Sequence, residues 1–336
     1  MSVVYRESDA TLEALNDCRI AVIGYGNLGR PFALNLRDSG VNVIVGNVDD
    51  DYAAQARRDG FQVMGVSEAA RIADFKLMLL PDEAMPEVYL NHISPNLKPG
   101  HTLLFASGYN VAFGFIEPPP FVDILLLAPR TIGTGVREGY VNGNGFLSFV
   151  AVGQDATNKS WSHLLALALA VGSLRAGAFE LTFRQEAELD LFIQQALMPA
   201  LQLLMFTAAD LLVKEGYPPE AALLDLYVSG ELAYSLNKAA ELGMMDTLKL
   251  YSLTGQYGIL SRSDRFLEPK LRRQMEISLE EIRSGKFAQE WAAEYANGYP
   301  RLEALRRKRN NMALWGLERQ VIELLHPLPS ETSPDS

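Results

Sequence analysis

The segment RIAVIGYGNLGRPFALNLRDSG, residues 19–40, decides the fold of this chain. A short apolar run lies directly before Gly24, Gly26 and Gly29, and an amphipathic stretch follows them. Gly-x-Gly-x-x-Gly is a weak motif alone, but between a strand and a helix it is typical of a dinucleotide site. Gly24 permits the tight turn, Gly26 lets a pyrophosphate approach the backbone, and Gly29 lets the helix pack against the strand. We therefore expect the phosphates at the helix N-terminus.

Apolar runs continue to alternate with helix-like stretches up to about residue 150. They read RIAVIG, VNVIVG, FKLMLLP, HTLLFAS, VDILLLAP and FLSFVAV. Continuous apolar runs of this length are typical of parallel strands that are buried on both faces. The alternation predicts a Rossmann-type α/β fold with a doubly wound parallel sheet.

Long helical stretches replace the strands after about residue 180. They cover 183–216, 219–242, 267–284 and 286–296. We expect a Rossmann domain over residues 1–180, an all-helical domain over 181–325, and a disordered Pro/Ser-rich tail over 326–336. Polar residues interrupt the most apolar stretch, 189–213, which favours a helix buried in protein over a membrane span.

Composition excludes several classes of partner. The chain has 336 residues, 48% of them hydrophobic. This length is too great for one hydrophobic core and suits two domains. Its net charge of -11 argues against nucleic acid, because phosphates need a basic surface. A single cysteine, Cys18, and a charged N-terminus favour a reducing cytoplasm. We expect a small-molecule substrate, with no nucleic acid and no membrane as partner.

The loop after the second strand indicates which nucleotide is preferred. Asn47 and Val48 lead there into three acids, and Asp49 lies twenty residues past Gly29, the spacing of a carboxylate that binds the adenosine ribose. Three acids repel a 2′-phosphate, and the loop has no Arg or Lys to hold one. NADH is therefore the preferred cofactor, with NADPH second. The plainer interpretation is that the acids cap the next helix.

Longer stretches resemble the ketol-acid reductoisomerase family. They include IGYGNLGRPFALNLRDSGVNVIVG, LLPDEAMPEVY, ISPNLKPGHTLLFASGYNVAFG, VDILLLAPRTIGTGVREGY, RAGAFELTFRQEAELDLF and NGYPRLEALRR, in order up to about residue 307. The length is similar to that of the family's short form. The resemblance implies a knotted helical domain and a homodimer whose site is completed across the interface. The cofactor positions that the motifs and the resemblance imply are Gly24, Tyr25, Gly26, Asn27, Leu28, Gly29, Asn47, Val48, Asp49, Asp51, Leu80, Pro81, Asp82, Met85, Ala106, Ser107 and Gly133.

Such enzymes migrate an alkyl group with the help of two magnesium ions and then reduce the ketone with a nicotinamide hydride. The family holds its metals with two pairs of acids at i, i+4. In the first pair Asp190 is present, but Gln194 replaces the second acid. In the second pair Glu231 is present, but Tyr227 replaces its partner. We therefore expect that the dinuclear metal site is not kept and that Mg²⁺ is not required, and a single weakly bound ion stays open as an alternative. The plainer interpretation of Asp190 and Glu231 is as polar remnants in a helical interface.

The proton-transfer positions have changed as well. The resemblance places Ser107 where the family has a histidine, and Arg130 where it has a lysine. A hydroxyl cannot take up a proton near neutral pH, and a guanidinium is a poor proton donor but can bind an acidic substrate. Ser252 aligns with the family serine that contacts the substrate carboxylate. Tyr227, Ser107 and Glu231 are the candidate proton donors, and the plainer interpretation of Tyr227 is that it fills volume.

These losses concentrate at the metals and at proton transfer, while the nucleotide motifs are intact. The sequence therefore predicts an NAD(P)H-dependent reductase without isomerase activity. Its substrate would be a C=N bond, or a conjugated C=C or C=O bond, of a small molecule in specialised metabolism, such as an imine. Two alternatives remain: a magnesium-dependent ketol-acid reductoisomerase with a divergent cage, and a non-catalytic nucleotide-binding homologue.

Overall fold

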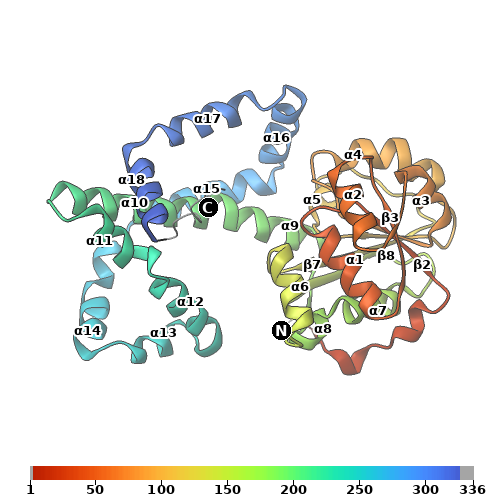
Figure 1. The fold of residues 1–336 in the computed structure, drawn as a ribbon, viewed down its shortest axis with the longest axis horizontal. Coiled ribbons are helices and arrows are strands. Elements are labelled where there is room, and N and C mark those ends of the chain that lie inside the picture. Colours follow the sequence, from red (N-terminus) through yellow and green to blue (C-terminus); the bar gives the residue numbers. More distant parts are fainter. Residues whose placement is uncertain (1–2, 326–336) are drawn as a thin grey trace, which may run out of the picture. The chain divides into compact units, whose positions relative to one another are not determined.

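The computed structural model describes residues 3–325, and the chain divides after Asp190 into two compact units. The first unit is built on a nine-stranded sheet in the order β1-β9-β8-β7-β6-β5-β2-β3-β4 (Figure 1). The strands are β1 (Val4–Tyr5), β2 (Arg19–Ile23), β3 (Asn42–Gly46), β4 (Gln62–Met64), β5 (Phe75–Met78), β6 (Thr102–Phe105), β7 (Asp123–Pro129), β8 (Ser148–Gln154) and β9 (Ala178–Glu180).

The Rossmann-type fold is confirmed, and the sheet is parallel over β2 to β7 but mixed beyond β7. Strands β2 to β7 pair in parallel, but β8 runs antiparallel to β7, and β1 runs antiparallel to β9. An apolar run that is buried on both faces looks the same in either direction, so the run over β8 could not reveal its orientation. The short strands β1, β4 and β9 were not predicted, because none of them contains a long apolar run.

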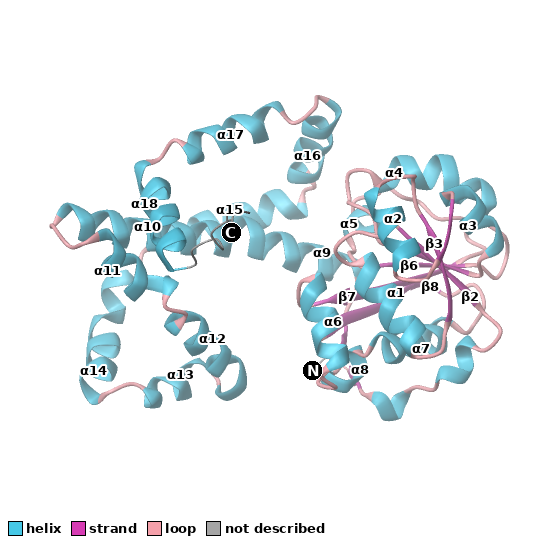
Figure 2. Ribbon diagram, in the orientation of Figure 1, coloured by secondary structure: helices cyan, strands magenta, loops and turns pink. Residues whose placement is uncertain are grey.

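Helices cover both faces of this sheet (Figure 2). Along β2 the side chains alternate between two separate cores: Ile20 and Val22 belong to one, Ala21 and Ile23 to the other. This alternation is the two-residue period of a strand. The helices of the unit are α1 (Gly29–Asp38), α2 (Asp51–Arg58), α3 (Val66–Ile72), α4 (Met85–Val88), α5 (Tyr109–Ala112), α6 (Gly133–Val141), α7 (Ser160–Val171), α8 (Ser173–Ala176) and α9 (Phe183–Phe192), whose last two residues belong to the second unit.

The second unit is all-helical, as predicted. Helix α16 matches the predicted stretch 286–296, whereas the stretch 219–242 is interrupted at Gly230, which has a φ of 81°. The elements are the π-helical turns η5 (Ile193–Leu197) and η6 (Leu224–Val228), and helices α10 (Met198–Lys214), α11 (Pro219–Leu223), α12 (Glu231–Leu242), α13 (Met244–Thr247), α14 (Leu253–Arg262), α15 (Pro269–Arg283), α16 (Lys286–Ala296), α17 (Pro300–Asn310) and α18 (Ala313–Leu325). The knot stays a prediction, and the predicted tail, 326–336, lies outside the described residues.

The second unit leaves many large apolar side chains exposed. Leu203 and Leu204 on α10 are 65% and 58% exposed, and Leu253 on α14 is 82% exposed. Within residues 3–325, the helical run Phe183–Lys214 is the one long and apolar enough to cross a membrane by length and composition alone. Only 11% of its most apolar window is buried. The prediction that this helix is buried is therefore wrong within a single chain.

Candidate functional site

The glycine loop, Gly24–Gly29, joins β2 to α1 with the geometry that its sequence predicts. Gly24 has a φ of 91°, and a Cβ on Gly29 would lie 2.0 Å from the carbonyl oxygen of Gly24. Both positions therefore exclude a side chain. A Cβ on Gly26 would meet nothing within 4 Å, so this glycine faces open space at the start of the helix. These residues fit a dinucleotide whose pyrophosphate lies against the backbone.

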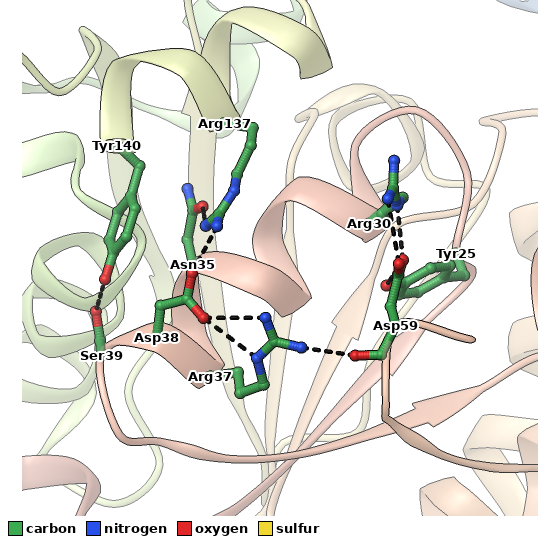
Figure 3. A network of polar contacts seen from close by, with 9 residues as sticks. All are labelled: Tyr25, Arg30, Asn35, Arg37, Asp38, Ser39, Asp59, Arg137 and Tyr140. Atoms are coloured by element: carbon green, nitrogen blue, oxygen red, sulfur yellow. Dashed lines mark hydrogen bonds and ion pairs between the residues drawn. The ribbon is translucent and has the colours of Figure 1, made fainter. Parts of the chain in front are cut away.

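Tyr25 has a structural role in this loop (Figure 3). Its side chain is 1% exposed, and its hydroxyl donates to Asp59 Oδ2 at 2.8 Å, where Arg30 Nε also donates at 2.7 Å. The Arg30 guanidinium beside it holds the pKa of Asp59 down at about 2. Burial and the Asp59 carboxylate raise the pKa of Tyr25. The network ties α1 to the end of α2, which leaves only the backbone of Tyr25 for a ligand.

The acids after β3 divide between two tasks. Asp50 caps α2, because its Oδ1 accepts from Ala53 N at 2.9 Å. Asp49 is 87% exposed and pairs with Arg57 Nη2 at 3.1 Å. The loop itself has no cation, as noted from the sequence, but Arg57 on α2 reaches it. The sequence pattern could not reveal this pair, which joins residues eight positions apart across the start of a helix.

The predicted cofactor residues lie on the loops after β2, β3, β5 and β6, at the first residues of α1, α2 and α4 that follow these loops, and at the start of α6. The strands β2, β3, β5 and β6 are parallel, so these loops lie at one edge of the sheet, where such folds bind their ligands. Gly133 approaches the glycine loop itself, because a Cβ there would lie 1.7 Å from Asn27 O. Met85 is buried, whereas Val48 is 67% exposed.

Glu186 on α9 organises the other end of the site. Its side chain is 1% exposed, its Oε2 accepts from Gly108 N at 2.6 Å, and its Oε1 pairs with Arg130 Nη2 at 3.0 Å. Burial raises the pKa of the Glu186 carboxyl. The sequence reasoning missed this residue. The available signal was its position four residues before Asp190, which puts both carboxylates on one helical face.

Arg130 lies between two carboxylates. Besides Glu186, its Nη1 is 3.5 Å from Asp190 Oδ1, its Nε donates to the carbonyl oxygen of Pro129 at 3.1 Å, and its guanidinium lies 4.9 Å from the centre of the Phe149 ring. The structure therefore brings together two predicted site residues, Arg130 and Asp190.

Asp82 completes an acid cluster, which we define as Asp82, Glu186, Asp190 and Arg130. Burial raises the pKa of Asp82 to about 7, and the negative charges of Glu186, Glu83 and Asp190 add to the shift. The Asn110 amide donates to Asp82 O at 3.0 Å and to its Oδ1 at 3.3 Å. The cluster combines three carboxyl groups with one guanidinium, so it favours positive charge in a ligand.

Ser107 lies on the loop between β6 and α5. Its hydroxyl oxygen accepts from Tyr109 N at 3.2 Å, which closes a local turn. The next residue, Gly108, packs so closely on α9 that a Cβ there would lie 2.2 Å from Phe183 O. Glu186 therefore holds this loop through one carboxylate oxygen and Arg130 through the other.

The other candidate residues belong to the second unit. The Tyr227 hydroxyl donates to the Glu318 carboxylate, and both side chains line a mostly apolar cavity of about 190 Å³. Glu231 begins α12 and is exposed, and Ser252 caps α14 by accepting from Gly255 N at 3.1 Å. Gln194 lies in η5. Within that unit Tyr227 contacts α18 through Glu318, and its role as a proton donor stays a prediction.

The donor set does not fit a magnesium cage. Mg²⁺ prefers several hard oxygen ligands in octahedral geometry. Asp190 is paired with Arg130, and Gln194 supplies only a neutral amide. Over residues 3–325, no three His, Cys, Asp or Glu side chains gather where they could hold a metal ion. We therefore derive no step through a metal.

Two family models together match most of the chain. "Acetohydroxy acid isomeroreductase, NADPH-binding domain" matches residues 14–177, and "Ketol-acid reductoisomerase, C-terminal domain" matches residues 183–326.

Curated relatives and a solved structure agree with these matches. The chain is 38% identical to "Ketol-acid reductoisomerase (NADP(+))" of Pyrobaculum calidifontis over 97% of this chain and 99% of the relative. It is 41% identical to the protein of that name in Methanopyrus kandleri, over 93% and 94%. The solved structure of an NADH-preferring ketol-acid reductoisomerase from an uncultured archaeal source superimposes with a TM-score of 0.90 at 33% identity, over 96% of this chain and 99% of that one.

Proposed function

Since the chain belongs to the ketol-acid reductoisomerase family, we propose that it is a reductase that keeps the family's hydride transfer but lacks its alkyl migration. That it is an NAD(P)H-dependent oxidoreductase follows from the family. The observation that carries the finer proposal is the contact of Asp190 with Arg130, next to a neutral Gln194. Migration relies on Lewis acids at these positions, whereas reduction needs a hydride donor, a shaped pocket and a proton source.

The acid cluster supports a cationic acceptor as the substrate. A protonated C=N bond is already polarised, and its positive charge is attracted by the net negative charge that three carboxyl groups and one guanidinium give the acid cluster. NADH supplies the hydride to the carbon of that bond, which gives an amine and the oxidised cofactor. A neutral imine or a conjugated ketone needs a proton as well. Besides Ser107, Tyr227 and Glu231, the structure offers Asp82, whose pKa of about 7 suits a general acid.

NADH is the proposed cofactor, with NADPH second. Asp49 is exposed at the ribose position, where its carboxylate can bind the 2′-hydroxyl and repels a 2′-phosphate. The structurally similar protein from the uncultured archaeal source is an NADH-preferring reductoisomerase, whereas the relatives are named for NADP(+). We place the reaction in the cytoplasm.

The test is oxidation of NADH by the purified chain with a panel of cyclic imines and conjugated ketones, in the presence of EDTA. We expect turnover of at least one C=N or conjugated substrate, and none of 2-acetolactate with Mg²⁺. The names of the relatives favour the second candidate, a magnesium-dependent reductoisomerase. Conversion of 2-acetolactate that requires Mg²⁺ would establish that candidate and overturn our proposal. Cofactor binding with no turnover of any substrate would favour a non-catalytic homologue.

We also propose that the enzyme is a homodimer that buries the exposed leucines of α10 and completes the site across the interface. Leu203 and Leu204 lie exposed on a helix with little cover in its own chain. A second copy would bury this apolar face. L204E should convert the dimer to a monomer in light scattering after gel filtration, while L90E, at a residue of the first unit that is 67% exposed, should leave it intact. A monomeric wild-type chain would contradict the proposal.

A further inference from the structure

The guanidinium of Arg130 is held from several directions. Glu186 lies 3.0 Å from Nη2, Asp190 lies 3.5 Å from Nη1, and the carbonyl of Pro129 lies 3.1 Å from Nε. The Phe149 ring supports the group at 4.9 Å. An arginine fork can contact two carboxylates through different nitrogens, whereas a lysine offers a single point charge.

Both carboxylates that Arg130 contacts project from one face of α9. Glu186 is almost fully buried and Asp190 is 41% exposed, so together they present negative charge from the interior to the surface. A pair of carboxylates with this spacing attracts a cation. The cation that the fold supplies there is the side chain at position 130.

We infer that Arg130 is the resident cation of this site, and that its guanidinium excludes a divalent metal ion from Glu186 and Asp190. A metal ion at Asp190 would have to displace an ion pair and would then lie next to a fixed positive charge. The inference rests on the proposed function, because both require the reduction to proceed without a metal. It goes further by naming the residue that excludes the ion.

The contacts of Arg130 explain how an arginine at this one position can exclude a metal ion from both carboxylates. The guanidinium is anchored at Glu186, whose other oxygen is taken by the backbone N–H of Gly108. Glu186 is therefore a positioning residue that aims Arg130 at Asp190. Removing the guanidinium takes the ion pair from the Asp190 carboxylate and leaves Glu186 with its Gly108 contact, so a cation from solution can take the place of the guanidinium.

The test is Mn²⁺ binding to the full-length chain, measured by the loss of the EPR signal of free Mn²⁺. Mn²⁺ takes the same hard oxygen ligands as Mg²⁺ and needs no turnover for its detection. We expect wild type to show no binding that D190N removes. R130Q should bind Mn²⁺ at least about tenfold more tightly than wild type does, a difference of about 1.4 kcal/mol. R130Q/D190N should lose this gain.

R137Q is the matched control. Arg137 pairs with Asp38 at 2.6 Å, and its side chain is 29% exposed, close to the 27% of Arg130. Loss of the Arg137 guanidinium removes the same charge from the same unit but leaves the contacts of Arg130 with Glu186 and Asp190 in place. R137Q should therefore leave Mn²⁺ binding unchanged. R130K tests the point if R130Q does not fold, since one ammonium group cannot bridge both acids in the same way. We expect R130K to bind Mn²⁺ more tightly than wild type and less tightly than R130Q.

Two results would overturn the inference. The first is Mn²⁺ binding by wild type that D190N abolishes, because the carboxylate would then be open to metal despite Arg130. The second is a folded R130Q or R130K that gains no site. These results are independent of the assay for imine reduction, so failure of the proposed function and failure of this inference can be told apart.

Discussion

The glycine loop and the acid cluster, both in the first unit, are built in different ways. The glycine loop is six consecutive residues whose backbone shape excludes side chains at Gly24 and Gly29. The acid cluster depends on contacts between distant segments, such as Gly108 and Glu186, which are 78 residues apart. A local backbone motif tolerates almost no substitution, whereas a side-chain cluster can be rebuilt one residue at a time without changing the fold. This difference explains how the chain can combine an intact nucleotide motif with the altered chemistry that we propose.

The largest effect is expected from G29A. Its Cβ would lie 2.0 Å from Gly24 O, a backbone atom that cannot move without opening the turn. We expect a loss of about 3 kcal/mol in the free energy of unfolding, which lowers the melting temperature of a unit this size by roughly 10 °C. Thermal unfolding followed by circular dichroism measures it.

G26A is the control for this substitution. A Cβ on Gly26 meets nothing within 4 Å in the protein, so the variant should fold like wild type. It should nevertheless bind NADH at least about tenfold more weakly, which corresponds to about 1.4 kcal/mol, because the methyl group takes the space of the pyrophosphate. Equal melting temperatures for G29A and G26A would contradict the steric argument.

The acid cluster should respond less severely to substitution. E186A removes the charge opposite Arg130 and the acceptor of Gly108 N–H, at a cost of about 2–3 kcal/mol. E186Q keeps an acceptor for the N–H and should cost about half as much. Urea unfolding gives both values. E7Q is the control, because it breaks an exposed ion pair in which Glu7 Oε1 lies 3.5 Å from Arg175 Nε. It should lower the free energy of unfolding by less than E186Q does. A loss for E7Q as large as for E186A would show that burial is unimportant here.

Asp82 gives the acid cluster a pH dependence that the glycine loop lacks. Its folded pKa is raised to about 7 from 3.8, chiefly by burial. The folded chain therefore keeps a proton that the unfolded chain has lost between these pH values, so stability falls as the pH rises from about 4 to 7. D82N removes this contribution. The melting temperature of wild type, relative to D82N, should decline over that window and level off above it. A constant difference would contradict the raised pKa.

The sequence predicted the parts of the molecule that depend on neighbouring residues. The six apolar runs became strands, and Gly24, Gly26 and Gly29 formed the expected turn, because sterics and periodicity act locally. The orientation of β8 and the role of Glu186 were missed. Both depend on which distant segments pack together, and one sequence gives no signal for that. The resemblance identified Arg130 as a replacement, but only the structure shows which two carboxylates it contacts.

The smallest effect is expected at Asp49, at the edge of the nucleotide site. We expect its carboxylate to repel a 2′-phosphate, and it also pairs with Arg57 through an exposed ion pair of 3.1 Å. D49N removes the repulsion and frees the guanidinium, which is 53% exposed, to contact a phosphate. The ratio of the dissociation constants for NADPH and NADH, measured by cofactor fluorescence, should shift toward NADPH by about threefold to tenfold, or roughly 1 kcal/mol.

The double variant D49N/R57Q separates the two causes of that shift. If the freed guanidinium binds the phosphate, adding R57Q should cancel much of the gain in NADPH affinity, and NADH affinity should stay unchanged. If the gain survives, relief of repulsion alone explains it, and Arg57 has no part in selectivity. In either case the preference depends on exposed side chains at the rim of the glycine loop. Selectivity at this end of the site can then change by substitution, as we propose for the chemistry of the acid cluster, while the loop itself stays fixed.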